Sequence, residues 1–307
     1  MVSRRRSLQF AGTAVAAALA GCSGDVLGND SSRTEYTLQV YRIATEPVPW
    51  ALYEPPENEL FGDPARAAID AVVPTGRHVT RGYTPISEGA YVEHDGQYYR
   101  IDQFVSGRAV RERPLVRVDT LDGAPDDAVL LDSLEQPSAR PVKILHTYAV
   151  SDGASSSASL LRGDAYVMAR PAERESRLVD ELDGRAVRMA ADGELAYRVH
   201  VERGRVTLTE HTTFATVVAD DREAFREVVL GSAVDTDLGA IDLSEDARTL
   251  LDRAIQREAY RETGEPSDAF ETLLRRLGFS ADESETGRIL WDGQSLYRAS
   301  FYVNRTD

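Results

Sequence analysis

Three Asp-Gly pairs, each between two segments of strand length, constrain the fold of this chain more than any other feature of its sequence. The pairs are Asp95-Gly96, Asp192-Gly193 and Asp292-Gly293. A type I′ turn needs positive φ at both central positions, and Asp-Gly is one of the pairs that meet this need most easily. The sequence therefore predicts three β-hairpins, which pair 90–94 with 97–105, 186–190 with 195–201, and 288–291 with 296–303.

The segments around the hairpins indicate a module that recurs. The hairpin sequences DGQYYR, DGELAYR and DGQSLYR agree in more than the turn pair. We expect an α+β fold of two or three small repeated units, each with a strand, a helix and an Asp-Gly hairpin. The expected helices cover 63–73, 171–182 and 245–255, and the β-rich segments ahead of them cover 36–44, 142–150 and 213–219. Three unrelated hairpins remain the alternative, because Asp-Gly also occurs elsewhere in the chain.

Composition divides the chain into segments. Residues 1–21 form a predicted signal peptide and 22–35 a polar, flexible tether. The predicted units cover 36–120, 142–210 and 211–307, with an acidic linker at 121–141, and the last two units can form one domain. Smaller features are helices at 222–230 and 267–277, a helical turn at 129–134 and a serine-rich loop at 152–159.

The first 22 residues have the pattern of a targeting signal. An arginine run that includes Arg4 and Arg5 precedes an apolar stretch at 10–20, which is too short to span a bilayer. The stretch leads through Leu-Ala-Gly into Cys22, the only cysteine of the chain. Lipid on this thiol would hold the chain at a membrane, because each buried methylene contributes about 0.8 kcal/mol. Otherwise Cys22 is an ordinary small residue near a signal cleavage site.

These residues resemble the twin-arginine signal and lipobox of haloarchaeal twin-arginine-exported lipoproteins, although Ser7 and Gln9 replace the usual Phe and Lys. The resemblance implies a lipid on Cys22, the membrane as partner, and a location on the outer face of the cell membrane. The hairpin units are similar to uncharacterised small α+β modules of such lipoproteins, to which no activity is attached. Asn29 and Asn304 lie in sequons that would allow N-glycosylation outside the cell.

The chain is strongly acidic, with a formal charge of −16, and Lys143 is its only lysine. An acid excess is typical of adaptation to multimolar salt, where a short Debye length screens the self-repulsion of the molecule. Codon bias in a GC-rich genome would explain the preference for arginine over lysine, but not the acid excess. Nucleic acid is not an expected partner, because phosphate binding needs a basic surface.

No motif in the sequence identifies a catalytic or metal site. The sequence has no Gly-x-Ser-x-Gly elbow, no nucleotide-binding glycine loop and no His-Glu-x-x-His pair. The histidines are scattered, with His146 and His200 in predicted strands, and the acidic cluster at 235–246 fails the EF-hand pattern. We therefore predict no catalytic residue, no metal and no cofactor.

The sequence favours a noncatalytic binding or interaction protein, lipid-anchored at the cell surface, with an unknown ligand. Tyrosines followed by Arg100, Arg198 and Arg298 could line a groove, but half-buried tyrosines and cross-strand ion pairs are the simpler interpretation. An extracellular hydrolase is the alternative function, because two carboxylates that meet only in space leave no sequence motif.

Overall fold

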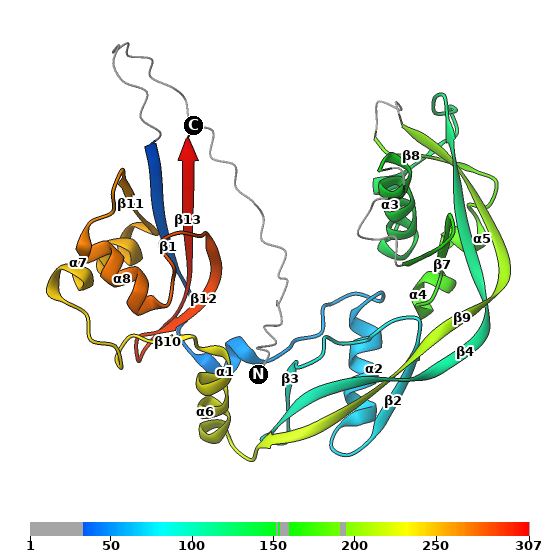
Figure 1. The fold of residues 1–307 in the computed structure, drawn as a ribbon. Coiled ribbons are helices and arrows are strands. Elements are labelled where there is room, and N and C mark those ends of the chain that lie inside the picture. The colour runs from blue at the N-terminus through cyan, green and yellow to red at the C-terminus, as the bar shows by residue number, and fades with distance from the viewer. Residues whose placement is uncertain (1–32, 152, 154–159, 191–194, 307) are drawn as a thin grey trace, which may run out of the picture.

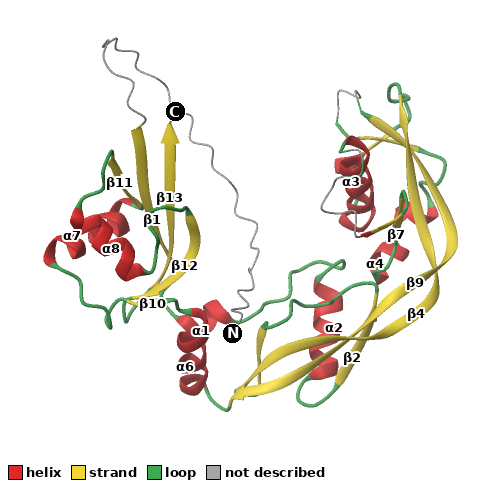
Figure 2. Cartoon of the chain, viewed as in Figure 1, coloured by secondary structure: helices red, strands yellow, loops and turns green. Residues whose placement is uncertain are grey.

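The computed structural model describes residues 33–151, 153, 160–190 and 195–306 and confirms an α+β fold (Figure 1). Two mixed β-sheets lie on either side of a pair of helices, and one sheet is drawn out into a long two-stranded ribbon (Figure 2). Within the described residues, no helix has both the length and the apolar character needed to cross a bilayer.

The first and last described parts of the chain share a five-stranded sheet of order β10-β12-β13-β1-β11. Its strands are β1 (Arg33–Ala44), β10 (Thr236–Asp237), β11 (Ala259–Thr263), β12 (Glu285–Trp291) and β13 (Leu296–Thr306). Helices α7 (Glu245–Arg257) and α8 (Asp268–Leu277) pack on it. Ser244 and Ser267 cap these helices by accepting backbone hydrogen bonds, and α8 ends at Gly278 with φ 85°.

The eight-stranded sheet is built on one antiparallel ribbon. Strands β4 (Gln97–Leu121) and β9 (Ala196–Ala219) pair from Tyr98 opposite Ala219 to Leu121 opposite Ala196. Near one end, β2 (Arg77–Arg81) pairs with β9 and β3 (Tyr91–His94) with β4. The remaining strands, near the other end, are β5 (Val129–Leu130), β6 (Leu161–Arg162), β7 (Ala165–Val167) and β8 (Ala186–Arg188).

Each end of the ribbon has its own helices and its own core. Helix α2 (Gly62–Val72) buries a stripe of small residues against Tyr99 and Ile101 of β4. The other end is covered by η1 (Leu131–Ser133), α3 (Gln136–Val150), α4 (Pro171–Arg174) and α5 (Arg177–Asp180). Their apolar side chains pack on Val116 and Val199 of the ribbon.

Helices α1 (Pro47–Ala51) and α6 (Arg222–Ala233) connect the ribbon to the five-stranded sheet. Phe225 of α6 is fully buried and stacks on Tyr98 of β4, with ring centroids 4.3 Å apart. On the other side of the junction, Trp50 and Leu230 pack against the cluster that contains Trp291 of β12. The junction therefore has a core of its own.

Two of the three predicted hairpins are confirmed. β3 and β4 meet at the Asp95-Gly96 turn, whose φ values of 51° and 79° are those that a type I′ turn requires. β12 and β13 also form a hairpin, but Trp291 pairs with Leu296, so the turn around Gly293 is longer than two residues. β8 and β9 pair antiparallel as predicted, whereas the turn at 191–194 lies outside the described residues.

The prediction that 142–150 is a β-rich segment is wrong. This segment belongs to α3, in which Ser138, Val142 and Leu145 are buried at helical spacing, so His146 also lies on a helix. Its β-branched and aromatic residues favour a strand locally, but packing of one face against the ribbon overrides that propensity. The helix predicted at 171–182 is divided into α4 and α5.

The two sheets do not follow the predicted units at 36–120, 142–210 and 211–307. Strand β1, expected in the first unit, pairs with β11 and β13, and β9 crosses the boundary at 210. Pairing of β4 with β9 joins the first two units into one sheet, and the structure does not confirm repeated units. The predicted helical turn in the linker corresponds to η1, and the loop at 152–159, apart from Gly153, lies outside the described residues.

Candidate functional site

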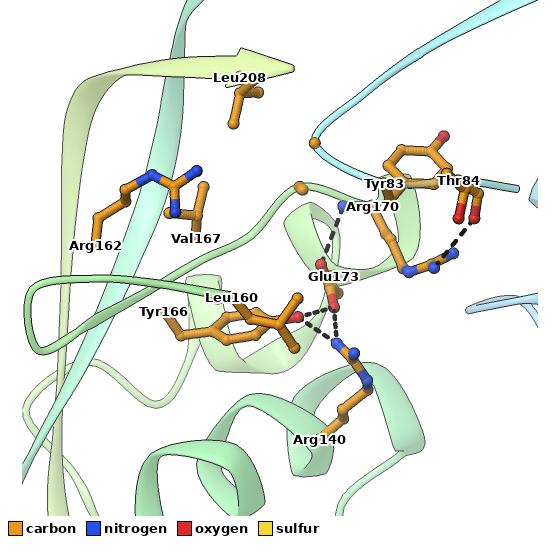
Figure 3. A pocket seen from close by; sticks show the side chains of 12 residues that line it. Tyr83, Thr84, Arg140, Leu160, Arg162, Tyr166, Val167, Arg170, Glu173 and Leu208 are labelled. Carbon is orange, nitrogen blue, oxygen red and sulfur yellow. Dashed lines mark hydrogen bonds and ion pairs between the residues drawn. The ribbon is translucent and has the colours of Figure 1, made fainter. Parts of the chain in front are cut away.

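A cavity of about 200 Å³ opens where one face of the ribbon meets α3 and α4 (Figure 3). Its walls come from the loop after β2, from α3, from the β6–β7 hairpin, from α4 and from β9. The lining residues with a charge or a phenol are Tyr83, Arg140, Arg162, Tyr166, Arg170 and Glu173. Segments distant in the sequence therefore meet at one polar pocket.

Glu173 is the centre of this pocket, and its side chain is fully buried. One carboxylate oxygen accepts hydrogen bonds from Arg140 Nη1 at 2.9 Å and from the Tyr166 hydroxyl at 2.6 Å. The other accepts from the backbone N–H of Arg170 at 3.0 Å. Helix α4 begins at Pro171, and Glu173 is its third residue. The Glu173 side chain therefore reaches back to the backbone N–H of Arg170, which precedes the helix, as in a capping box. Local sequence thus fixes the carboxylate in place.

Arg170 is held between two aromatic rings. The centre of its guanidinium lies 4.7 Å from the ring centroids of both Phe61 and Tyr83. It also donates a hydrogen bond to the carbonyl of Leu60 at 3.3 Å. Burial lowers the pKa of Arg170, while the nearby charge of Glu173 opposes this shift. The guanidinium is therefore partly desolvated and pre-positioned.

The hydroxyl of Tyr166 stays protonated in this environment. Burial raises its pKa well above the ordinary range of tyrosine, and the charge of Glu173 raises it further. Arg140 donates a hydrogen bond to the same hydroxyl, which in turn donates to Glu173. Tyr166 therefore couples the arginine to the buried carboxylate as a hydrogen-bond donor, not as a phenolate.

The pocket has a charge opposite in sign to that of the whole chain. Its lining contains Arg140, Arg162 and Arg170 against one acid, Glu173, a local charge of +2, whereas the chain carries −16. Guanidinium groups present several donors in a planar fork that matches carboxylate and phosphate oxygens. The arrangement is thus suited to holding an anion.

The same arrangement does not fit the hydrolase alternative. Glycoside hydrolysis needs two carboxylates about 5–9.5 Å apart, and the residues that line the pocket include one, Glu173. That carboxylate is already engaged with three donors. Among the described residues, no group of three or more His, Cys, Asp or Glu side chains could hold a metal ion.

Of the predicted site residues, Asn304 lies in the described part of the chain, and it does not line the pocket. Arg4, Arg5, Cys22 and Asn29 lie outside the described residues, so their predicted roles stay predictions. Asn304 is exposed on β13, where its backbone lies opposite Glu35 of β1. No structural observation tests whether it is glycosylated.

The tyrosines and arginines beside the hairpins have structural roles, but not as the half-buried rings and cross-strand ion pairs that the sequence suggested. Tyr99 and Tyr197 are almost fully buried in the cores. Arg100 forms an ion pair with Asp102 at 3.0 Å, and Arg198 donates to the carbonyl of Gly184 at 2.7 Å. These side chains stabilise the sheets and do not line the cavity.

Sequence reasoning missed every charged residue of the pocket. Arg140 and Arg162 carry no recognisable motif, and they lie in the predicted linker at 121–141 and in the predicted α+β unit at 142–210. The one available signal was local: Pro171 after Arg170, with Glu173 at the third helical position, is the pattern of a capped helix start.

The chain matches no family model, and neither the curated proteins nor the solved structures contain a match to it.

Proposed function

We propose that this chain is an exported, lipid-anchored surface protein that binds a small anionic ligand without transforming it. The observation that carries this proposal is the pocket around Glu173, in which three arginines outnumber one buried carboxylate. The carboxylate positions Arg140, and the rings of Phe61 and Tyr83 position Arg170, so little ordering is left for the ligand to induce.

The acidic surface is compatible with anion binding in a saline medium. At molar salt the Debye length falls to about 3 Å, so the repulsion between a distant acidic surface and an anion is screened. Partly buried charges are screened much less, and Arg170 is one of them. The local charge of the pocket therefore governs binding even though the chain carries −16.

The proposed anchor is Cys22, supported by the Leu-Ala-Gly-Cys run and the upstream arginines. We expect Cys22→Ser to release the protein from membranes into the medium, because the mutant has no thiol to carry lipid. Retention of Cys22→Ser in the membrane fraction would contradict lipid anchoring. This experiment leaves the pocket intact and so tests the location separately from the ligand.

Calorimetric titration of the purified protein in molar salt tests the pocket. The probes are acetate, malonate, inorganic phosphate and sulfate, each against the wild type and Arg162→Gln. We expect at least one probe to bind the wild type, and Arg162→Gln to weaken it by about tenfold, or 1.4 kcal/mol. Arg248→Gln, at an exposed position on α7, which packs on the five-stranded sheet, is the matched control and should bind normally. Failure of every probe to bind the wild type would refute the proposal.

A further inference from the structure

Next to the pocket lies a second group of arginines that the proposed function does not use. Arg111 and Arg113 lie on β4, Arg174 ends α4 and Arg81 ends β2. Arg111 and Arg113 are two residues apart on one strand, so their side chains leave the same face. Their cross-strand neighbours on β9 share that face with Leu208, which lines the pocket.

Arg113 is the centre of this group. Its Nε atom is buried without a hydrogen-bond partner, although another nitrogen of the guanidinium donates to a backbone carbonyl at 2.8 Å. Burial lowers the pKa of Arg113, and the charges of Arg174, Arg111 and Arg81 lower it further. Arg81 is itself countered by Glu210 through an ion pair of 2.6 Å. Arg113 is therefore partly desolvated among like charges, an arrangement that a bound anion would stabilise.

The group adjoins the pocket through Tyr83. Burial raises the pKa of this pocket residue, and the charges of Arg170, Arg174 and Arg113 all oppose the shift. One tyrosine thus lies within electrostatic reach of both sets of arginines. Arg170 immediately precedes α4 and Arg174 ends it, so this short helix connects the two sets.

We propose that Arg113, with Arg111 and Arg174, forms a second anionic subsite, so that the ligand is a compact molecule with two anionic groups. This inference rests on the proposed function, because the first anionic group is the one that the pocket around Glu173 holds. Carboxylate and phosphate share the chemistry that guanidinium recognises. The ligand class is therefore a dicarboxylate, a bisphosphate or a molecule with one group of each kind.

Calorimetric titration with paired probes tests the second subsite. Acetate is compared with the dicarboxylates malonate, succinate, glutarate and adipate, and methylphosphonate with bisphosphonates of the same spacings. For the wild type we expect the best dianion to bind about 100-fold tighter than its monoanion, because the second group binds intramolecularly. Arg113→Gln should remove most of this gain and leave monoanion affinity within about twofold. The matched control is Arg108→Gln, on the same strand but on the opposite face.

The outcomes separate the two proposals. If the wild type bound monoanions and dianions with equal affinity, the proposal of a second subsite would fail and the proposal of the first pocket would stand. The same conclusion would follow if Arg113→Gln lowered the affinity for monoanions and dianions equally. If no probe bound the wild type, both proposals would fail. Should Arg113→Gln not fold, Arg174→Gln on α4 carries the same expectation, and the wild-type preference for dianions is measured without any variant.

Discussion

Replacing Glu173 by Gln should separate the stability of the pocket from its affinity for anions. The amide keeps the shape of the side chain but offers one acceptor where the carboxylate has two. Arg140 and Tyr166 share one carboxylate oxygen and the backbone N–H of Arg170 binds the other, so an NH₂ group faces a donor in either orientation. The buried ion pair is lost at the same time.

The magnitude follows from burial. Breaking a buried ion pair costs about 3–5 kcal/mol, and the lower end applies because Arg140 keeps 24% of its side chain exposed while Glu173 keeps none. At about 2–4 °C per kcal/mol, Glu173→Gln should lower Tm by about 6–12 °C. Glu181→Gln is the control, because its ion pair with Arg177 is 46–54% exposed and contributes about 0.5 kcal/mol or less.

Thermal unfolding followed by circular dichroism, with and without a bound anion, measures both effects. Loss of the Glu173 charge raises the net positive charge of the lining residues, so an anion should bind more tightly to Glu173→Gln than to the wild type and should raise the Tm of the variant more. A Tm equal to that of the wild type would refute the role of the carboxylate in holding Arg140. Weaker anion binding by the variant would refute the electrostatic account of the pocket.

Three further predictions concern the fold. Phe225→Ala should destabilise the protein by about 3–5 kcal/mol in urea unfolding, because a fully buried ring stacked on Tyr98 is lost; a loss under 1 kcal/mol would contradict a packed junction. Burial lowers the pKa of His78 and of His211, so the unfolded chain binds protons first and stability should fall as pH drops below about 6.5. Replacing both histidines by Gln should flatten that dependence, and an unchanged slope would contradict it. Gly278→Ala should cost about 1–2 kcal/mol at its φ of 85°, with Arg288 displaced from the new methyl group; an unchanged urea midpoint would count against it.

The parts of the fold that could be predicted are those encoded by neighbouring residues. Asp95 and Gly96 specify their turn through their own backbone preferences, and Ser244 and Ser267 specify helix starts through hydrogen bonds to the next turn. The wrong prediction of a β-rich segment at 142–150 also rests on neighbouring residues. Their local propensity favours a strand, but packing against the ribbon makes this segment a helix.

The long ribbon could not be predicted in this way. β4 and β9 pair from Tyr98 opposite Ala219 to Leu121 opposite Ala196, and no tight turn joins the two strands to indicate that pairing in the sequence. The pocket is non-local for the same reason, since Arg140, Arg162 and Arg170 converge only after the ribbon and α3 have packed. These arginines therefore have no characteristic spacing in the sequence by which the pocket could be predicted.

The position of β1 has a mechanical consequence for an anchored molecule. β1 is the first described strand, and it lies between β11 and β13, antiparallel to both. In an anchored molecule, a pull along the axis of β1 would load both hydrogen-bonded ladders in shear at the same time, whereas an edge strand pulled crosswise separates one bond after another. The five-stranded sheet would therefore resist such a pull through two ladders at once, in the direction in which hydrogen-bonded strands separate least easily.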